Sequence, residues 1–310
     1  MQKILVIKLA VNNTLGIDTS NYTTSAALFR DGAIKQEKML LPVKEGELGL
    51  RQSDAVFHHV QQLPVILETL LSEKQPIEAV GASSRPRDLE GSYMPCFTVG
   101  LGTAKAVSKA LGVPMRTFSH QAGHIAAALY SAGKLSLIHQ KFIAFHVSGG
   151  TTEAVLVMPD ELLARSLDLK GGQAVDRVGA MLGLSFPAGR ELERLAQETE
   201  IHFKIKPSLK GADCSLSGIE NKCGELLRKG KPKEEIASYC LQAILSALDG
   251  MAEELLKQYG ELPLLFAGGV MSNGMIRKAL TGKYGAYFAE PAFSADNAAG
   301  IAILTSIKGA

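Results

Sequence analysis

The sequence predicts an α/β protein built from two related lobes, and two observations lead to that prediction. Patterns typical of strands and of helices alternate along all 310 residues, which favours sheets flanked by helices. One strand–turn–strand segment also recurs, because residues 17–28 align without gaps onto residues 145–156, an offset of 128 (145 minus 17). Solenoid repeats have periods of only ~20–50 residues, so we expect that a whole lobe has been duplicated.

The positions that recur are small, hydroxylated or apolar. Ser20, Thr23, Thr24, Ala26 and Leu28 recur as Ser148, Thr151, Thr152, Ala154 and Leu156. The alternative is a chance match between two β-hairpins, since short motif matches carry a real risk of false positives.

The front of the chain predicts a sheet of three strands. Residues 15–20 and 25–30 have strand patterns, and Asp31-Gly32 is a typical hairpin turn that would return the chain over 33–41. Further along, predicted helices cover 53–74, 99–111, 125–130, 234–258 and about 294–308, and predicted strands cover 114–118 and 263–267. We expect one lobe over residues 1–140 and the other over 141–310, with the last helix packing back toward the first lobe.

The composition is that of an ordinary globular protein. Hydrophobic residues make up 46% of the chain and charged residues 21%, and a net charge of +2 excludes a basic surface spread over the whole molecule. Contact with RNA would therefore need a partner or a local patch. Candidates for such a patch are Arg85, Arg87, Lys204, Lys206, Lys210, Lys222, Arg228, Lys229, Lys231 and Lys233. The alternative is a solvated face, because Asp213, Glu220 and Glu225 are interspersed.

The cysteines and the hydropathy indicate a cytoplasmic protein. The four cysteines show no CxxC spacing, so we expect reduced thiols. No stretch reaches the ~18 apolar residues that a membrane span needs. Lys8 interrupts the apolar run at the start, so we do not expect an export signal.

Three turns have the composition of anion-binding loops. Small residues let backbone N–H groups approach a phosphate closely, and hydroxyls add donors. Two of these turns, facing each other across a cleft between the lobes, would grip the phosphates of a nucleotide; the third leads into a helix. The candidate residues are Asp18, Thr19, Ser20 and Asn21 in the first turn, Val147, Ser148, Gly149, Gly150 and Thr151 in the second, and Gly268, Gly269 and Asn273 in the third.

Two histidines predict a metal site. His120 and His124 are four residues apart where a strand passes into a helix, so both imidazoles can reach one ion. The alternative is that they only cap or pack the helix. A zinc protease would carry glutamate at the position of Gln121, so its general base is missing. Asp296 is the candidate third ligand, although it could instead only complement the dipole of the last helix.

Together these motifs resemble the bacterial TsaD family, the tRNA N6-threonylcarbamoyladenosine synthases. The resemblance covers residues 15–308 and rests on Gly16-Ile17-Asp18-Thr19-Ser20, His120-x-x-x-His124, Val147-Ser148-Gly149-Gly150, Ala267-Gly268-Gly269-Val270-x-x-Asn273 and Asp296-Asn297-Ala298-Ala299. It implies a fold of two actin-like (ribonuclease H-like) lobes, each a mixed β-sheet flanked by helices. It also implies an iron or zinc ion held by His120, His124 and Asp296.

The resemblance further implies the ligand, the reaction and the partners. The nucleotide site would include Asp176, Gly189 and Glu193 together with the loop from Val147 to Thr151 and Asn273. The ligand would be an adenine nucleotide (ATP, AMP or an acyl-adenylate). The reaction would move a threonylcarbamoyl group from its adenylate to the exocyclic amine of an adenosine beside the tRNA anticodon. A small actin-like paralogue and an ATPase would be partners.

The sequence departs from the family pattern around the nucleotide and keeps the metal ligands. The departures are Thr151 in place of a histidine, Gln173 in place of a glutamate, Asn21-Tyr22-Thr23-Thr24 in place of Cys-Asp-Glu-Thr, and Arg85-Pro86-Arg87-Asp88 in place of a glycine-rich loop. Two alternatives therefore stay open. One is an ATP-dependent kinase, which would leave the histidine pair unused. The other is a divergent paralogue that binds nucleotide and metal, with a different carbamoyl-type transfer or a regulatory or scaffold role.

Overall fold

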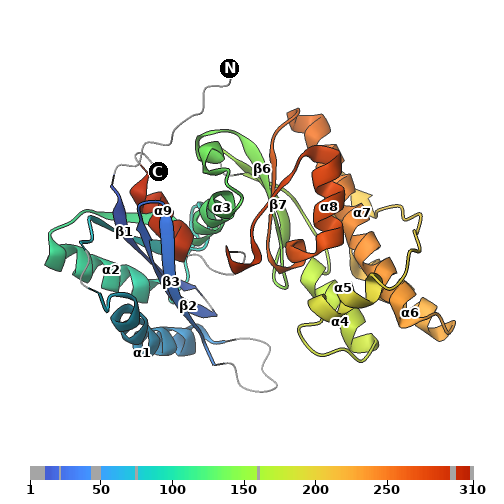
Figure 1. The fold of residues 1–310 in the computed structure, drawn as a ribbon, viewed down its shortest axis with the longest axis horizontal. Helices are drawn as coiled ribbons and strands as arrows, with labels where there is room; N and C mark the ends of the chain where they lie inside the picture. Colours follow the sequence, from blue (N-terminus) through green and yellow to red (C-terminus); the bar gives the residue numbers. More distant parts are fainter. Residues whose placement is uncertain are drawn as a thin grey trace. The chain divides into compact units, whose positions relative to one another are not determined.

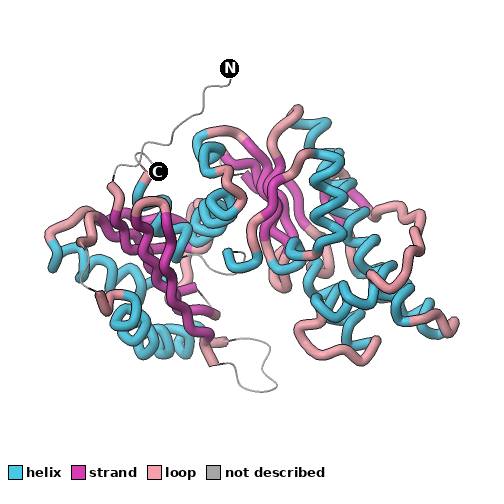
Figure 2. Tube along the Cα trace, viewed as in Figure 1, coloured by secondary structure: helices cyan, strands magenta, loops and turns pink. Residues whose placement is uncertain are grey.

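The computed structural model describes residues 11–20, 22–42, 50–73, 76–158, 161–293 and 298–307. The chain divides into two compact units. Unit 1 comprises Met1–Ile138 and Ala292–Ala310, and unit 2 comprises His139–Pro291. In both units a sheet is flanked by helices (Figures 1 and 2).

Unit 1 contains a mixed sheet whose order, among the described residues, is β3-β2-β1-β4-β5. β2 runs antiparallel to its neighbours β1 and β3, whereas β4 and β5 continue the sheet in parallel. The strands are β1 (Asn13–Ser20), β2 (Thr23–Arg30), β3 (Ala33–Leu40), β4 (Ala79–Arg85) and β5 (Met115–Ser119).

Helices cover both faces of this sheet (Figure 1). Leu15 and Ile17 of β1 point to the face covered by α1 (Gln52–Leu70) and α2 (Phe97–Leu111), where they join the apolar core. Gly16 lies between them in β1, so a side chain at this position would point to the opposite face of the sheet. That face is covered by α9 (Ala298–Ser306). α3 (His120–Ser131) packs against α9 through Ala126, Ile301 and Leu304.

Unit 2 repeats the sheet with the order β12-β11-β6-β7-β8 over the described residues. Its core combines the inward side chains of β6 and β7 with those of the helices that follow. The strands are β6 (Phe142–Val147), β7 (Thr152–Val157), β8 (Glu161–Arg165), β11 (Leu264–Ala267) and β12 (Tyr287–Phe288), with a separate small pair, β9 (Leu209–Lys210) and β10 (Asp213–Cys214). The helices are α4 (Gly171–Met181), α5 (Gly189–Ala196), α6 (Ser217–Arg228), α7 (Lys233–Tyr259) and α8 (Gly274–Tyr284), and short 3-10 turns cover Leu135–His139, Gly269–Ser272 and Pro291–Phe293.

The two sheets confirm the predicted duplication. Ile17 pairs with Ala26 across β1 and β2, and Phe145 pairs with Ala154 across β6 and β7. Adding 128 to the first pair gives the second, and the neighbouring pairs agree in the same way. The repeated sequence therefore carries the same strand register in both units. Both sheets share one strand order, with β1 and β6 central, and both are flanked by helices, which confirms the predicted class of two α/β lobes with mixed sheets.

Most predicted elements are present, with differences at their ends. The second helix begins at Phe97, and the helix predicted over 53–74 ends at Leu70. The largest difference is α3, which begins at His120 and not at Ile125. The reason is a cap: the Ser119 side chain accepts a hydrogen bond from the backbone N–H of Ala122, which lets the helix start at the residue after the serine.

No helix in the described part of the chain combines the length and the apolar sequence that a bilayer span requires.

The packing of α9 depends on a close approach of two backbones. A Cβ atom placed on Gly300 would lie 1.8 Å from the carbonyl oxygen of Gly123, in the first turns of α3. Real Cβ contacts are much longer, so α9 cannot carry a side chain at position 300 unless one of the two helices moves. α9 also contacts the backbone of β1, since a Cβ on Gly16 would lie 2.4 Å from the carbonyl oxygen of Ala298. α3 and α9 are therefore held at a fixed, short separation.

We predict opposite effects for two glycine-to-alanine changes in helices. Gly300→Ala should lower the free energy of unfolding by about 1–3 kcal/mol or more, because backbone must move to admit the methyl group. Gly102→Ala in α2, where nothing lies within 4 Å of the added atom, should raise it by about 0.5–1 kcal/mol. Urea denaturation measures both changes. Equal effects of the two substitutions would contradict the proposed packing.

Candidate functional site

The first candidate site lies in unit 1, at the start of α3. Because Ser119 caps the helix, His120 is its first residue and His124 follows one turn later. The two imidazole rings lie side by side, with centroids 4.7 Å apart and planes at 69°. Phe97 of α2 packs edge-on against His120, with its ring centroid 5.8 Å from the imidazole centroid.

Asp18 orients the first of these histidines. Its carboxylate is buried at the end of β1, and Oδ1 lies 3.1 Å from Nδ1 of His120. Burial by itself would raise the pKa of Asp18, but the neighbouring His120 ring, through its hydrogen bond and through its charge when protonated, holds that pKa below its ordinary value. An ionised carboxylate accepts the Nδ1 proton, so Nε2 of a neutral His120 carries the lone pair that a metal needs.

A second carboxylate fixes the loop that follows β4. Asp88 forms an ion pair with Arg85 and accepts a hydrogen bond from the Ser119 hydroxyl, 2.6 Å away. Pro86 adds a further link, because its carbonyl oxygen accepts from the N–H of Gln121 at 3.1 Å. The loop that replaces a glycine-rich segment of the resembled family is thereby attached to the start of α3.

Two predicted ligands, His120 and His124, are thus brought together. Asp296, the third, lies outside the described residues. Within the ranges that the structure describes, no three His, Cys, Asp or Glu side chains are arranged around a common metal position. The three-ligand set therefore stays a prediction.

The second candidate site is a cavity of about 500 Å³ within unit 2. That is a typical volume for a small-molecule pocket. Its wall is formed by the start of α4, the start of α5, the middle of α7 and the turn before α8. The lining residues are Gly149, Gly172, Val175, Asp176, Pro187, Gly189, Arg190, Glu193, Leu241, Gly269, Val270, Ser272, Asn273 and Pro291.

One wall of this cavity is a tight turn pressed against a helix N-terminus. The N–H of Ser148 donates to the carbonyl of Thr151 at 2.7 Å, and the Ser148 hydroxyl accepts from the N–H of Thr151 at 3.2 Å. The N–H of Gly172 donates to the carbonyl of Ser148 at 3.0 Å. A Cβ on Gly172 would lie 2.6 Å from the backbone nitrogen of Gly149, so glycine is required for this approach. The positive end of α4 therefore lies at the cavity.

Two carboxylates contribute to the cavity wall, each with one oxygen bound to backbone. Oδ1 of Asp176 accepts from the N–H of Ala188 at 3.0 Å, and Oε1 of Glu193 accepts from the N–H of Gly274 at 2.7 Å. These bonds hold the starts of α5 and α8 in place around the cavity. The second oxygen of each carboxylate is left to accept hydrogen bonds from hydroxyl groups of a ligand.

The side-chain amide of Asn273 has one atom that is hydrogen-bonded within the protein and one that, among the described residues, is not. Its Oδ1 accepts from the N–H of Ile276 at 3.0 Å, so the side chain is the N-cap of α8 and its amide orientation is fixed. The Nδ2 group then points elsewhere. It is buried and donates to no partner among the described residues. A buried amide without an acceptor is unfavourable by about 1–3 kcal/mol, so a ligand acceptor would satisfy it.

The predicted nucleotide residues divide into two groups. Six line the cavity, namely Gly149, Asp176, Gly189, Glu193, Gly269 and Asn273. The other five, Val147, Ser148, Gly150, Thr151 and Gly268, are not among the lining residues; Val147 is fully buried in the core of unit 2.

The first predicted loop is less suited to a ligand. Thr19 is fully buried, its hydroxyl donating to the carbonyl of Cys96 at 2.9 Å and accepting from the N–H of Gly100 at 3.1 Å. That hydroxyl thus joins β1 to α2. Asp18 contacts His120, Ser20 lies at the end of β1, and Asn21 lies outside the described residues.

Several lining residues were not predicted. Arg190 and Ser272 carry no motif of their own, and Val175, Leu241 and Val270 have the apolar character of ordinary core. Only their places in the sequence could have predicted them, because Arg190 follows the predicted site residue Gly189 and Ser272 precedes the predicted site residue Asn273. Leu241 gives no such signal, because it lies in the middle of the longest helix of the described chain.

Comparison with known proteins gives one family. The sequence model of the TsaD family, described as tRNA N6-adenosine threonylcarbamoyltransferase, matches residues 45–303. A protein of that name from Thermus thermophilus is 32% identical over 305 residues, which cover 93% of this chain and 90% of the relative.

Solved structures share the fold at low sequence identity. HypF from T. kodakarensis has a TM-score of 0.63 and 13% identity, with 97% of this chain and 48% of that chain covered. Component A of the (R)-2-hydroxyglutaryl-CoA dehydratase from Acidaminococcus fermentans has a TM-score of 0.55 and 17% identity, with 96% and 98% covered. Both support the two-lobed α/β architecture alone.

Proposed function

The chain belongs to the TsaD family of tRNA N6-adenosine threonylcarbamoyltransferases, and we propose that it transfers a threonylcarbamoyl group from threonylcarbamoyl-AMP to the exocyclic amine of the adenosine beside the tRNA anticodon. The observation that carries this proposal for the chain itself is the cavity of unit 2, with the unsatisfied amide of Asn273 in its wall. We expect the reaction to occur in the cytoplasm, where all four cysteines, which are free thiols, would stay reduced.

The residues of the cavity suit an adenylate. Val175, Leu241 and Val270 offer an apolar wall for the base. The second carboxylate oxygens of Asp176 and Glu193, which are not bound to backbone N–H groups of the described residues, can accept hydrogen bonds from the ribose hydroxyls. Gly149 and Gly269 present backbone without side chains, so a phosphate can approach their N–H groups.

The transfer step is an attack of an amine on a carbonyl carbon. A bond forms between the adenosine nitrogen and the carbamoyl carbon, the bond from that carbon to the phosphate oxygen breaks, and AMP leaves as the amine loses a proton. The N–H groups beside Gly149 and the N-terminus of α4 would stabilise the charge on the departing phosphate. Arg190 is the cationic side chain in the cavity wall and would act in the same way.

The start of α3 suits a metal ion. The imidazoles of His120 and His124 would hold it, with Asp18 orienting His120 and Asp296 as the expected third ligand. An iron or zinc ion bound there would supply Lewis-acid chemistry and a template for the substrate.

Protein partners are part of the proposal. Phe57, Val60 and Val65 on the outer side of α1 are each more than half exposed, although they are apolar. Such a stripe suits the helices of another protein, and we expect the small actin-like paralogue to bind there. The ATPase partner is carried over from the family resemblance alone.

A transfer assay tests the proposed function. Purified protein with metal and partners, threonylcarbamoyl-AMP and an unmodified tRNA transcript should yield N6-threonylcarbamoyladenosine, detected by mass spectrometry after nuclease digestion. A transcript with guanosine at the target position should yield none. If the complete mixture gives no product, the chain is the regulatory or scaffold paralogue.

We predict that the protein binds one metal ion per chain. His120→Ala should abolish stoichiometric binding, and Asp18→Asn should weaken metal affinity by about 10- to 100-fold, because an oriented imidazole is lost. His202→Ala, which removes an exposed histidine of unit 2, is the control and should retain full metal content. Elemental analysis after reconstitution with iron(II) or zinc measures the content. Full occupancy in the His120 variant would exclude this site.

We predict that Asn273→Asp separates ligand binding from folding. Aspartate keeps an oxygen to cap α8 but has no N–H, so the affinity for AMP should fall by about tenfold or more, while the melting temperature stays near that of the wild type. Asn273→Ala should lose both affinity and about 1 kcal/mol of stability, because the cap is gone. Calorimetric titration and thermal unfolding give the two readouts. Unchanged AMP affinity in the aspartate variant would rule out a contact with Nδ2.

A further inference from the structure

We propose that the extended segment 201–210 of unit 2 is a contact surface for the phosphate backbone of tRNA. This inference rests on the proposed function for the choice of tRNA as the partner. It adds a place where tRNA binds the chain, outside both candidate sites. The residues that carry it are Lys204, Lys206 and Lys210, which we call the lysine strap.

The segment is fixed along α7 by hydrogen bonds. The N–H of Phe203 donates to Oε1 of Gln242 at 2.9 Å, and Nε2 of Gln242 donates to the carbonyl of Ile201 at 2.7 Å. One helical turn further on, the hydroxyl of Ser246 donates to the carbonyl of Ile205 at 3.0 Å. The segment is therefore held in an extended shape before any partner binds, which lowers the entropy lost on binding.

Its side chains alternate between two faces. Phe203, Ile205 and Leu209 are half-buried; Phe203 packs on Tyr239, and Leu209 packs over Gly250 of α7. The three lysines of the strap occupy even positions among them and are exposed. A period of two is the pattern of an extended chain with one face covered. The apolar residues thus set the direction in which the lysines point.

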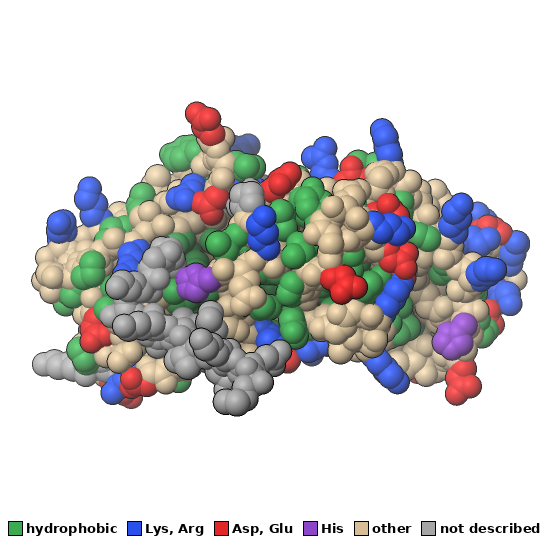
Figure 3. Space-filling model, turned by 90° about the horizontal axis from the view of Figure 1, so that it is seen from above, with side chains coloured by type: hydrophobic (Ala, Val, Ile, Leu, Met, Phe, Trp, Pro, Cys, Tyr) green, Lys and Arg blue, Asp and Glu red, His purple; other side chains and the backbone are tan. Residues whose placement is uncertain are grey.

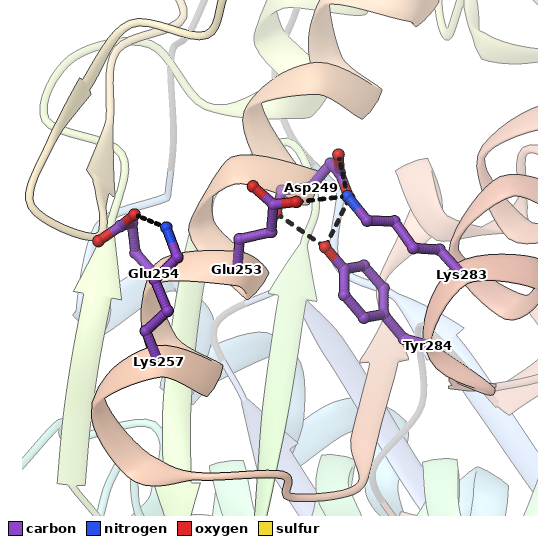
Figure 4. Close-up of polar contacts among 6 residues, drawn as sticks. All are labelled: Asp249, Glu253, Glu254, Lys257, Lys283 and Tyr284. Atoms are coloured by element: carbon purple, nitrogen blue, oxygen red, sulfur yellow. Dashed lines mark hydrogen bonds and ion pairs between the residues drawn. The ribbon is translucent and has the colours of Figure 1, made fainter.

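Several other lysines of unit 2 form ion pairs with carboxylates, unlike the lysines of the strap in the described part of the chain. Lys283 is bound by Asp249 and Glu253, and Lys257 by Glu254 (Figure 4). Lys229 and Lys231 have Glu225 and Glu235 as partners. For the lysine strap, the described residues supply no carboxylate at ion-pair distance.

Three acidic side chains lie near the strap in sequence. Two of them, Asp213 and Glu198, have other partners, and the third, Glu200, is exposed and forms no ion pair with the strap among the described residues. Asp213 pairs with Lys210 in the ladder of β9 and β10, but its Oδ1 accepts from the N–H of Arg165 at 2.7 Å. Glu198 forms an ion pair with Arg194. The segment 201–210 itself contains three lysines and no aspartate or glutamate.

The spacing and the surroundings favour a phosphate backbone as the partner. Residues two apart in an extended chain lie about 6.6 Å apart, which is shorter than the ~10 Å Debye length at 0.1 M salt, so neighbouring lysines act together. Lysine binds phosphate as a point charge and does not distinguish bases. On the face shown in Figure 3, basic and acidic side chains are intermixed.

The test measures the salt dependence of tRNA binding by the full chain. Wild-type protein is compared with Lys204→Gln/Lys206→Gln/Lys210→Gln and with a control of equal charge change, Lys229→Gln/Lys231→Gln/Lys257→Gln. Fluorescence anisotropy with labelled, unmodified tRNA is recorded over a range of KCl concentrations on either side of physiological ionic strength. AMP affinity and melting temperature check that both variants are folded.

The strap variant should lose about 10- to 100-fold in affinity at ~0.1 M salt, and its slope of log K against log[KCl] should be shallower by about 2–3, near ~0.7–0.9 for each lost phosphate contact. The loss should be equal for tRNAs of different sequence. The control variant should change the slope by less than about 1. Equal slopes in the wild type and the strap variant, or equal losses in both variants, would overturn the proposal.

These results are independent of the transfer assay. If tRNA binds through the strap but no threonylcarbamoyl group is transferred, the contact surface stands and the proposed function fails. If transfer occurs and the strap variant has an unchanged KM for tRNA, the function stands and the contact surface is wrong.

Discussion

Two backbone contacts that only glycine permits determine the geometry of both candidate sites. In unit 1, Gly300 brings α9 against the carbonyl of Gly123, between the two histidines of α3. In unit 2, Gly172 brings the start of α4 against the turn at Gly149. In each case a helix lies closer to its neighbour than any side chain would allow. The two histidines lie on α3 and Asp176 lies on α4, so these contacts hold in place the helices that carry them.

The polar residues of the sites serve structure and ligand at once. Asn273 caps α8 with one atom and leaves the other unsatisfied. Asp176 and Glu193 each use one oxygen to fix a helix start, and Asp18 is buried against His120. A buried polar group without a hydrogen-bond partner is unfavourable, so the unsatisfied Nδ2 of Asn273, in the wall of the cavity, suits an acceptor atom of a ligand.

The same reasoning separates surface charge that stabilises the fold from charge left for a partner. Lys283 joins α7 to α8 through Asp249 and Glu253, and Tyr284 donates to Asp249 at 2.6 Å beside it. Burial and the hydrogen bond to Asp249 raise the pKa of Tyr284 above its ordinary value, so the phenol keeps its proton, and with it this hydrogen bond, at an alkaline pH where a free tyrosine would ionise. The lysine strap has no such partners among the described residues. A small net charge therefore does not exclude a local basic surface.

The sequence by itself determined the α/β class, the duplication and the register of the repeated hairpins, because strand alternation and the 128-residue repeat are local patterns. It also indicated the histidine pair, but the separation of the two rings was decided only in the structure, where the Ser119 cap places both residues on α3. Only the tertiary structure decided which loop residues reach the cavity. Thr19 and Val147 have the composition of ligand loops but are buried in packing contacts, whereas Leu241, in the middle of a long helix, lines the cavity. Burial depends on contacts between residues far apart in the chain, and no local pattern encodes them.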